Sequence, residues 1–151
     1  MPNSNLVEAF KQAFKPLGFK KKVANWYRSS GDLYTVVGLQ DSSWDGSNYV
    51  NIGFAPVAYA KSGWLADSKC LVRFRAESIT SISRDSLILL SGRTMKEVAG
   101  DDLRAAVLEH IANPVARVVD PVEDIQDLKM LLRTKVSDQV FIHRDIKKEL
   151  D

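Results

Sequence analysis

Cysteine is almost absent from this sequence of 151 residues, since Cys70 is its single example. One cysteine can form no disulfide within the chain, which excludes a secreted disulfide framework and fits a reducing compartment. A thiol nucleophile needs a nearby base to lower its pKa, and the two histidines, His110 and His143, lie far away in the sequence. We therefore expect Cys70 to be a small buried or half-buried residue beside a strand.

Long apolar runs are also missing. No segment approaches the roughly 20 apolar residues that a membrane helix needs. The opening residues, Met1 to Asn5, lack the basic and apolar regions of a signal peptide. We therefore expect a cytoplasmic protein with no signal peptide and no membrane partner.

The motifs of common catalytic and cofactor sites are missing as well. The sequence contains no phosphate-binding loop, no glycine motif for dinucleotides and no Gly-x-Ser-x-Gly. Its histidines and cysteine have no metal-ligand spacing, and its carboxylates are concentrated at helix starts, where they act as caps or favourable charges. We therefore expect no metal and no cofactor, and no residue is singled out as catalytic.

What is present is an ordinary globular composition, with 45% hydrophobic and 26% charged residues. This length fits a single domain spanning residues 1–151. The net charge of +2 is too small to indicate a nucleic-acid partner by itself, but residues 1–75 carry +5 and residues 76–151 carry −3. This dipole could present one side to an anionic partner. We favour the simpler interpretation that the two halves dock and partly neutralise each other.

The hydrophobic pattern predicts a helix followed by a block of strands. Apolar residues at helical spacing run from Leu6 to Leu17, and Pro16 and Gly18 close the helix. Alternation and β-branched and aromatic residues then predict four strands. A short apolar run after them fits a fifth, buried strand. The expected strands are residues 21–29, 33–40, 48–55, 71–76 and 86–91.

The C-terminal third is predicted to be helical. A first helix, starting at Asp101 or Asp102, contains Pro114, which predicts a kink or a break after Ala112. A second helix is expected to start at Asp120, which would cap it. Because strands precede helices, the pattern predicts an α+β fold: an N-terminal helix packed on an antiparallel sheet of four or five strands, with C-terminal helices.

Alternation along the strands separates the block into two faces. If Gly31-Asp32 or Ser30-Gly31 forms a two-residue turn, Trp26 shares an apolar face with Val37 and Leu39, and this face should pack against the first helix. We call the opposite face the polar–aromatic face. Its predicted members are Asn25, Tyr27, Tyr34, Gly38, Gln40, Tyr49, Asn51, Gly53, Arg73 and Arg75.

The polar–aromatic face is either a solvated or helix-covered surface or a binding surface. Its glycines leave room for a group to approach the backbone, its tyrosines offer flat contact area, and its arginines can hold a carboxylate or a phosphate. Trp44, in a polar loop nearby, is expected to anchor on the sheet. The alternative is that it is an exposed interaction residue. The candidate binding residues are Tyr27, Gln40, Trp44, Tyr49, Asn51, Arg73 and Arg75.

A short basic run, Lys20-Lys21-Lys22, could contact phosphates together with Lys11 and Lys15. Lysines at a helix-to-strand junction are more often solvated, and no motif of an RNA-binding fold is present. We therefore do not expect a nucleic-acid partner.

Four runs in the strand block form a connected pattern. They are Pro16-Leu17-Gly18-Phe19-Lys20-Lys21-Lys22, Trp26-Tyr27-Arg28, Val37-x-Leu39-Gln40-x-Ser42-Ser43-Trp44 and Tyr49-Val50-Asn51-Ile52-Gly53. This pattern resembles the mainly bacterial family known as domain of unknown function 4304. Arg73-x-Arg75 and the helix around Pro114 are also similar to that family, whereas residues 57–90 match it poorly. The resemblance implies no activity and no catalytic residues.

We therefore expect a non-catalytic binding or protein-interaction module that uses the polar–aromatic face. Some uncharacterised bacterial domains of this size act as immunity proteins beside toxins, so an immunity-type role is an analogy of size and class. The alternative is a small enzyme or an anionic-ligand-binding domain with its pocket over the same face. It predicts a concave cavity there and a carboxylate or tyrosine with a strongly shifted pKa. The expected partner is accordingly another protein or a small anionic ligand.

Overall fold

The computed structural model describes the chain in five stretches, residues 4–41, 48–60, 63–78, 100–134 and 140–151. Trp44 and the strand predicted at residues 86–91 lie outside the described residues.

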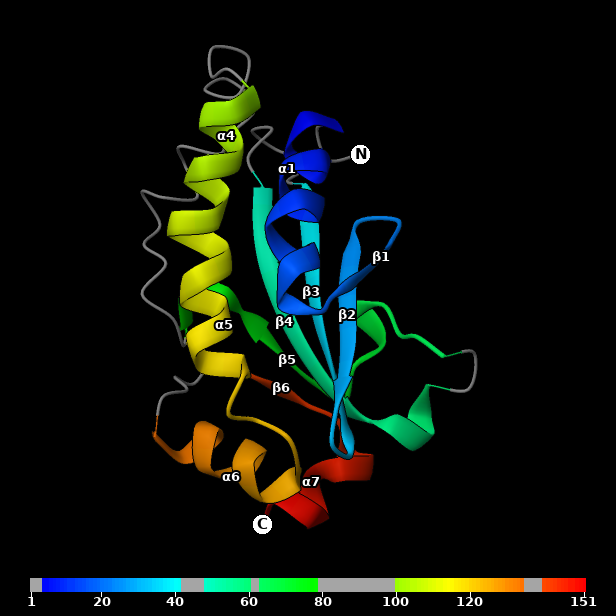
Figure 1. Ribbon diagram of the computed structural model, residues 1–151. Coiled ribbons are helices and arrows are strands. Elements are labelled where there is room, and N and C mark those ends of the chain that lie inside the picture. The colour runs from blue at the N-terminus through cyan, green and yellow to red at the C-terminus, as the bar shows by residue number, and fades with distance from the viewer. Residues whose placement is uncertain (1–3, 42–47, 61–62, 79–99, 135–139) are drawn as a thin grey trace.

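Within the described residues, six antiparallel strands form one sheet, and their order in space is their order in the chain. The sheet confirms the α+β prediction, with an N-terminal helix and C-terminal helices around it (Figure 1). The strands are β1 (Lys20–Lys22), β2 (Asn25–Ser30), β3 (Leu33–Asp41), β4 (Asn48–Pro56), β5 (Val72–Arg75) and β6 (Phe141–Ile142).

The β2–β3 turn sets the register on which the two predicted faces depend. Ser30 pairs with Leu33, so Gly31 and Asp32 form a two-residue turn, and Gly31 adopts the positive φ (57°) that such turns favour. Trp26 consequently pairs with Val37 on the apolar face, as predicted. The same register places all ten predicted residues of the polar–aromatic face on the opposite side of the sheet.

The number of strands differs from the prediction of four or five. The segment predicted as one strand, residues 21–29, is two strands, because the chain reverses at Val23. Val23 has a φ of 56° and is 68% exposed, and neither of the two turn residues, Val23 and Ala24, is glycine or asparagine. The apolar patch at residues 140–142 supplies the sixth strand, whose partner β5 lies far away in the sequence.

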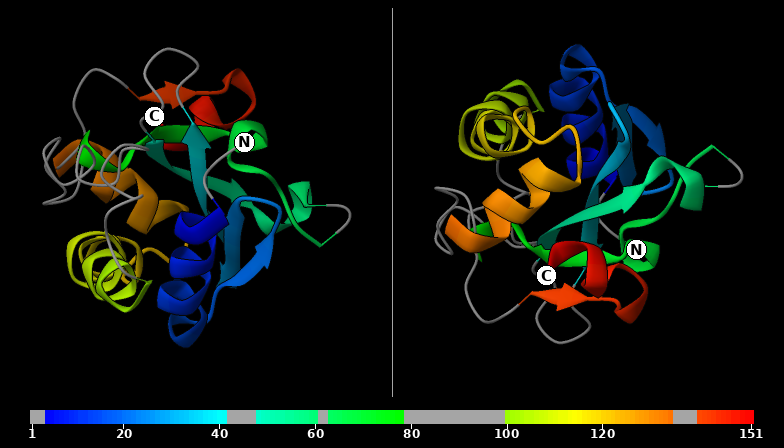
Figure 2. Two further views of the ribbon diagram at one scale, coloured as in Figure 1. Left: turned by 90° about the horizontal axis from the view of Figure 1, so that it is seen from above. Right: turned by 90° about the horizontal axis from the view of Figure 1, so that it is seen from below.

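The helices are arranged mainly on the apolar face and at one end of the sheet (Figures 1 and 2). Helix α1 and the continuous α4–α5 rod lie on the apolar face, and α6 and α7 lie at the end where the β2–β3 turn is found. Their bounds are α1 (Ser4–Phe14), α4 (Gly100–Val107), the π-helical segment η5 (Leu108–Ala112), α5 (Asn113–Val119), α6 (Ile125–Thr134) and α7 (Arg144–Leu150).

The core confirms that the apolar face packs against the first helix. Trp26 is only 1% exposed, and its ring lies 5.1 Å from the ring of Phe10 and 6.3 Å from that of Phe14, measured between centroids. Aromatic rings at these separations add pairwise attraction to the burial of apolar area. The α1 stripe and β2 are therefore joined through large buried rings.

Pro114 does not break its helix. The preceding turn is π-helical, and Asn113 donates its N–H to the carbonyl of Leu108, five residues back. A proline cannot donate to the carbonyl four residues back, and its ring clashes with that carbonyl, so the wider turn accommodates it without ending the helix. Of the two predicted outcomes, a kink or a break after Ala112, the break is wrong, because α5 continues through Val119 after the π-helical turn.

Asp120 does not start the following helix. It follows α5, and its carboxylate accepts a bond of 2.5 Å from the Arg28 guanidinium. The next helix, α6, begins at Ile125, where Asp124 accepts the N–H of Asp127 in the manner of a cap. The predicted cap at Asp120 is therefore wrong, because a tertiary ion pair uses that carboxylate. None of the helices in the described residues is long and apolar enough to span a membrane.

Candidate functional site

A crossing segment, residues 63–71, lies over the polar–aromatic face of the sheet. Tyr34 donates its hydroxyl hydrogen to the carbonyl of Gly63, and the backbone N–H of Asp67 donates to Asn25 Oδ1 at 3.0 Å. Both of these side chains come from the polar–aromatic face, whereas α1 and α4–α5 lie on the other side of the sheet (Figure 2). Part of the face is therefore covered by this segment.

The two glycines of the polar–aromatic face make room for the crossing segment. A Cβ atom on Gly38 would lie 2.4 Å from the carboxylate carbon of Asp67, and one on Gly53 would lie 2.7 Å from both Cβ and Sγ of Cys70. A side chain at either position would force the crossing segment to shift, so the two glycines permit this close approach. The group that approaches the backbone here is thus part of the chain itself.

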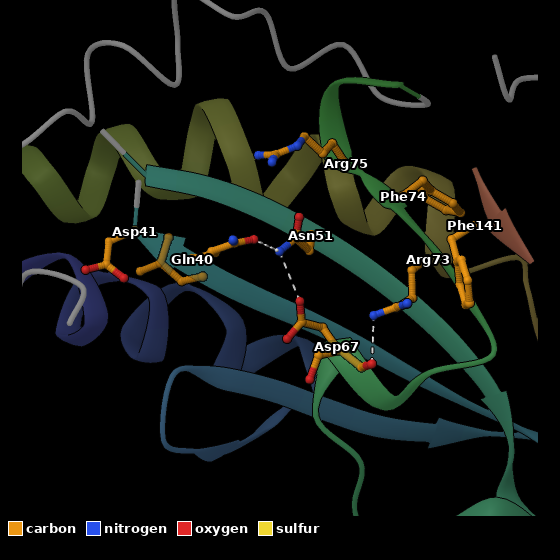
Figure 3. Close-up of a pocket in the computed structure, with 10 residues that line it drawn as sticks. Gln40, Asp41, Asn51, Asp67, Arg73, Phe74, Arg75 and Phe141 are labelled. Atoms are coloured by element: carbon orange, nitrogen blue, oxygen red, sulfur yellow. Dashed lines mark hydrogen bonds between the residues drawn. The ribbon is translucent and has the colours of Figure 1, made fainter. Parts of the chain in front are cut away.

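Beside the crossing segment, the polar–aromatic face is hollowed by a pocket of about 560 Å³, which we call the arginine pocket (Figure 3). Four strands and the crossing segment contribute to its walls. The lining residues are Leu39, Gln40, Asp41, Asn51, Asp67, Ser68, Arg73, Phe74, Arg75 and Phe141.

An amide and carboxylate network fixes one wall of the arginine pocket. The Asn51 side-chain amide donates to Gln40 Oε1 at 2.9 Å and to Asp67 Oδ2 at 3.0 Å. Figure 3 shows these bonds joining strands β3 and β4 to the crossing segment. The carboxylate of Asp67 is therefore held in a defined position at the edge of the pocket.

Two arginines also line the pocket, and each contacts an aromatic ring. The Arg75 guanidinium carbon lies 3.6 Å from the ring centroid of Tyr49, and that of Arg73 lies 4.1 Å from the centroid of Phe141. Such contacts attract the cation to the ring face and fix its plane. Arg73 also donates an Nη1 hydrogen to the carbonyl of Ser68 at 2.7 Å.

Each arginine nevertheless retains a buried donor without an acceptor. Nη1 of Arg75 and Nε of Arg73 are both shielded from solvent and have no hydrogen-bond partner. Within the described residues, neither guanidinium forms an ion pair with a carboxylate. A buried cationic donor with no acceptor is costly, since desolvation is not compensated by a bond.

The structure brings most of the predicted site residues together. Gln40, Asn51, Arg73 and Arg75 line the arginine pocket, and the ring of Tyr49 supports Arg75. The other two predicted residues, Tyr27 and Trp44, are not placed at the pocket by the structure. Tyr27 packs between Trp64, at 6.3 Å, and Tyr34, at 6.1 Å, away from the pocket lining, and Trp44 lies outside the described residues.

Sequence reasoning missed Asp67, Ser68 and Phe141. The first two belong to a stretch with no helical or strand period, so no pattern placed them over the sheet. Phe141 stood in an apolar patch, and its pairing with Arg73 across β5 and β6 depends on a long-range contact. The signal that could have found the crossing segment was the pair of glycines, which indicated a close approach to the backbone.

Cys70 is a buried residue without nucleophilic character. Burial, followed by the negative charge of Asp67, raises the pKa of its thiol from 9.0 to about 12. Its Sγ lies against Gly53 and bonds weakly to the Ala66 carbonyl at 3.6 Å. The thiol thus acts as a packing group beneath the crossing segment, which agrees with the sequence interpretation.

We expect Cys70 to resist thiol reagents in the native protein. A pKa raised from 9.0 to about 12 leaves a thiolate fraction roughly a thousandfold below that of an ordinary cysteine at pH 8, and burial slows access further. The measurement is the rate of reaction with an aromatic disulfide reagent. The protein unfolded in concentrated guanidinium chloride is the control and should react at once. Rapid stoichiometric labelling of the folded protein would contradict this expectation.

His143 has a structural role at the start of α7. Its Nδ1 accepts the backbone N–H of Asp145 at 3.1 Å, which caps the helix. Across the described stretches of the chain, no group of three or more histidine, cysteine, aspartate or glutamate side chains is placed to hold a metal ion.

The comparisons with known proteins give a family and no function. No curated protein and no solved structure matches the chain. The family model described as Domain of unknown function (DUF4304) matches residues 10–117, which include α1 from Phe10 onward, the strands of the arginine pocket except β6, and the helix around Pro114. Since this match covers more than half of the chain, the protein belongs to the DUF4304 family.

Proposed function

We propose that the protein is a non-catalytic binding module that takes an anionic group of its partner into the arginine pocket. The observation that carries this proposal is that the guanidinium groups of Arg73 and Arg75 line the pocket and form no ion pair with a carboxylate of the described residues. A carboxylate or phosphate group bound in the pocket would accept hydrogen bonds from the guanidinium groups that line it. Because the rings of Tyr49 and Phe141 already fix the guanidinium planes, binding would lose little side-chain entropy.

Another protein is the partner that we propose first. An exposed acidic side chain presented by such a partner would meet a cationic wall rimmed by Phe141, which is 44% exposed. Arginine and aromatic side chains of this kind dominate the energetics of many protein interfaces. An immunity protein that covers a toxin would be one module of this type, by analogy of size and class. The protein would work in the reducing cytoplasm, where its single cysteine stays a thiol.

A small anionic ligand is the second candidate, and the size of the arginine pocket favours it. Its volume of about 560 Å³ falls within the range of roughly 300–1,000 Å³ that is usual for small-molecule sites. An enzyme using this pocket belongs to the same alternative. The cavity over this face supports this alternative, which also predicted a carboxylate or tyrosine with a strongly shifted pKa.

The test is an NMR titration with a hexaglutamate peptide blocked at both ends and, separately, with inorganic phosphate. We expect peptide-induced shifts at the backbone amides of Gln40, Asn51 and Arg73. Arg75→Glu should weaken peptide binding about 10- to 100-fold, since a bond to a charged group contributes roughly 1.5–3 kcal/mol. Arg75 is the better site for substitution, because Arg73 also holds the crossing segment through Ser68.

Lys15→Glu is the matched control, because it makes the same change of net charge at an exposed lysine outside the arginine pocket. It should leave the binding unchanged at moderate salt. Equal weakening by the two variants would mean that overall charge governs binding and would refute a specific pocket. Shifts with phosphate alone would favour the small-ligand candidate.

A further inference from the structure

The arginine pocket carries charges of both signs that are not paired with each other. Arg73, Arg75, Asp41 and Asp67 all line it, and neither guanidinium group lies within salt-bridge distance of either carboxylate. Opposite charges in one pocket ordinarily attract each other and pair. Their separation here therefore calls for a physical cause.

Asp67 is held away from the arginines by the sheet. Its Oδ2 accepts a hydrogen bond from the side-chain amide of Asn51 at 3.0 Å, and its backbone N–H donates to Oδ1 of Asn25 at 3.0 Å. Its carboxylate also lies against Gly38, which has no side chain to keep it away. Among the described residues, no group donates to its other oxygen, Oδ1. One acceptor of a fixed carboxylate thus remains for a ligand.

The arginines are held in turn by their own partners. Arg75 stacks on Tyr49, whereas Arg73 stacks on Phe141 and donates to the Ser68 carbonyl. Moving either cation onto Asp67 would break these contacts. The pocket therefore holds a fixed carboxylate and fixed guanidinium groups that do not pair with each other, and a ligand with both charges would bind to both kinds of group.

We propose that the arginine pocket binds a zwitterionic ligand of the peptide type, an amino acid or short peptide with a free ammonium group and a free carboxylate. Its carboxylate would bind Arg75, its ammonium group would bind Asp67, and an apolar side chain would lie on the exposed ring of Phe141. This inference rests on the proposed anion-binding function and adds the second charge. A ligand carrying only negative charge would place nothing on Asp67 and would bind less tightly.

The experiment uses the dipeptide alanylphenylalanine in four forms: unblocked, N-acetylated, C-amidated, and blocked at both ends. Calorimetry or NMR titration with the wild-type protein should show the unblocked form binding at least about tenfold more tightly than either singly blocked form. Asp67→Asn should make the unblocked and N-acetylated forms bind equally while keeping the preference for a free carboxylate. Arg75→Gln should instead make the unblocked and C-amidated forms bind equally, because the preference for a free carboxylate is lost.

The outcomes separate this inference from the proposed function. If the N-acetylated dipeptide binds wild-type protein as tightly as the unblocked form, the zwitterionic ligand is overturned while anion binding stands. The zwitterionic ligand is likewise overturned if blocked hexaglutamate binds and no dipeptide does. Failure of every carboxylate-bearing probe removes both proposals. The comparison of the four dipeptides needs no variant, so it decides the question even if Asp67→Asn fails to fold.

Discussion

Phe10→Ala is expected to lower the free energy of unfolding by about 3–5 kcal/mol, as is usual when a fully buried phenylalanine is truncated. Phe10 is 0% exposed, and its ring lies 5.7 Å from that of Phe14 and 5.1 Å from that of Trp26. The truncation removes apolar burial and leaves a cavity between α1 and the sheet. Because small domains have a total stability of only about 5–15 kcal/mol, this is a large fraction. Equilibrium denaturation in urea measures it.

Met130→Ala is the control for this experiment. The Met130 side chain is 63% exposed on α6, so its truncation should change the unfolding free energy by no more than about 0.5 kcal/mol. A loss of similar size in both variants would mean that α1 does not form the core with β2. The expected contrast therefore tests the packing of the helix stripe on the apolar face.

Gly31→Ala is expected to cost about 2–4 kcal/mol, although it adds only one methyl group. Gly31 has a φ of 57°, which an L-residue adopts only with strain, and a Cβ there would lie 2.5 Å from the carbonyl oxygen of Glu123. That carbonyl also accepts the N–H of Asp32 at 3.0 Å. The substitution must therefore push the residues before α6 away from the β2–β3 turn and weaken this bond.

Gly18→Ala provides the matched comparison for Gly31→Ala. Gly18 also has a positive φ, 89°, but nothing lies within 4 Å of the position that a Cβ would occupy. Its alanine variant should show only the backbone strain, about 1–2 kcal/mol. Equal losses in the two variants by urea denaturation would show that the contact between the turn and Glu123 contributes nothing to stability.

The pocket depends on the same scaffold that these two experiments probe. Strands β3, β4 and β5 carry Gln40, Asn51, Arg73 and Arg75, and their relative positions are set by the pairing register. Sites built on paired strands hold their side chains more firmly than sites on loops. Asp67 belongs to the crossing segment, yet its bonds to Asn51 and Asn25 tie it to the sheet.

The sequence predicted the faces of the sheet well because the period of a strand is local. Alternation and one turn placed Gly38, Asn51 and Arg75 on a single face, and the observed register joins them in adjacent pairs. Local signals failed where a long-range contact decided the outcome. Asp120 carries the pattern of a helix cap but pairs with Arg28 instead, and the reversal at Val23 has no turn residue to mark it.

By itself, the sequence determined the α+β class, the apolar face beneath α1 and four side chains of the pocket, because helix and strand periods fix which residues share a face. Only the tertiary structure decided that the face has a pocket. A stretch without a period, residues 63–71, crosses the sheet where Gly38 and Gly53 leave space, and β6 brings Phe141 beside Arg73. These contacts join residues distant in sequence, so they depend on the packing of the whole domain and carry no local pattern.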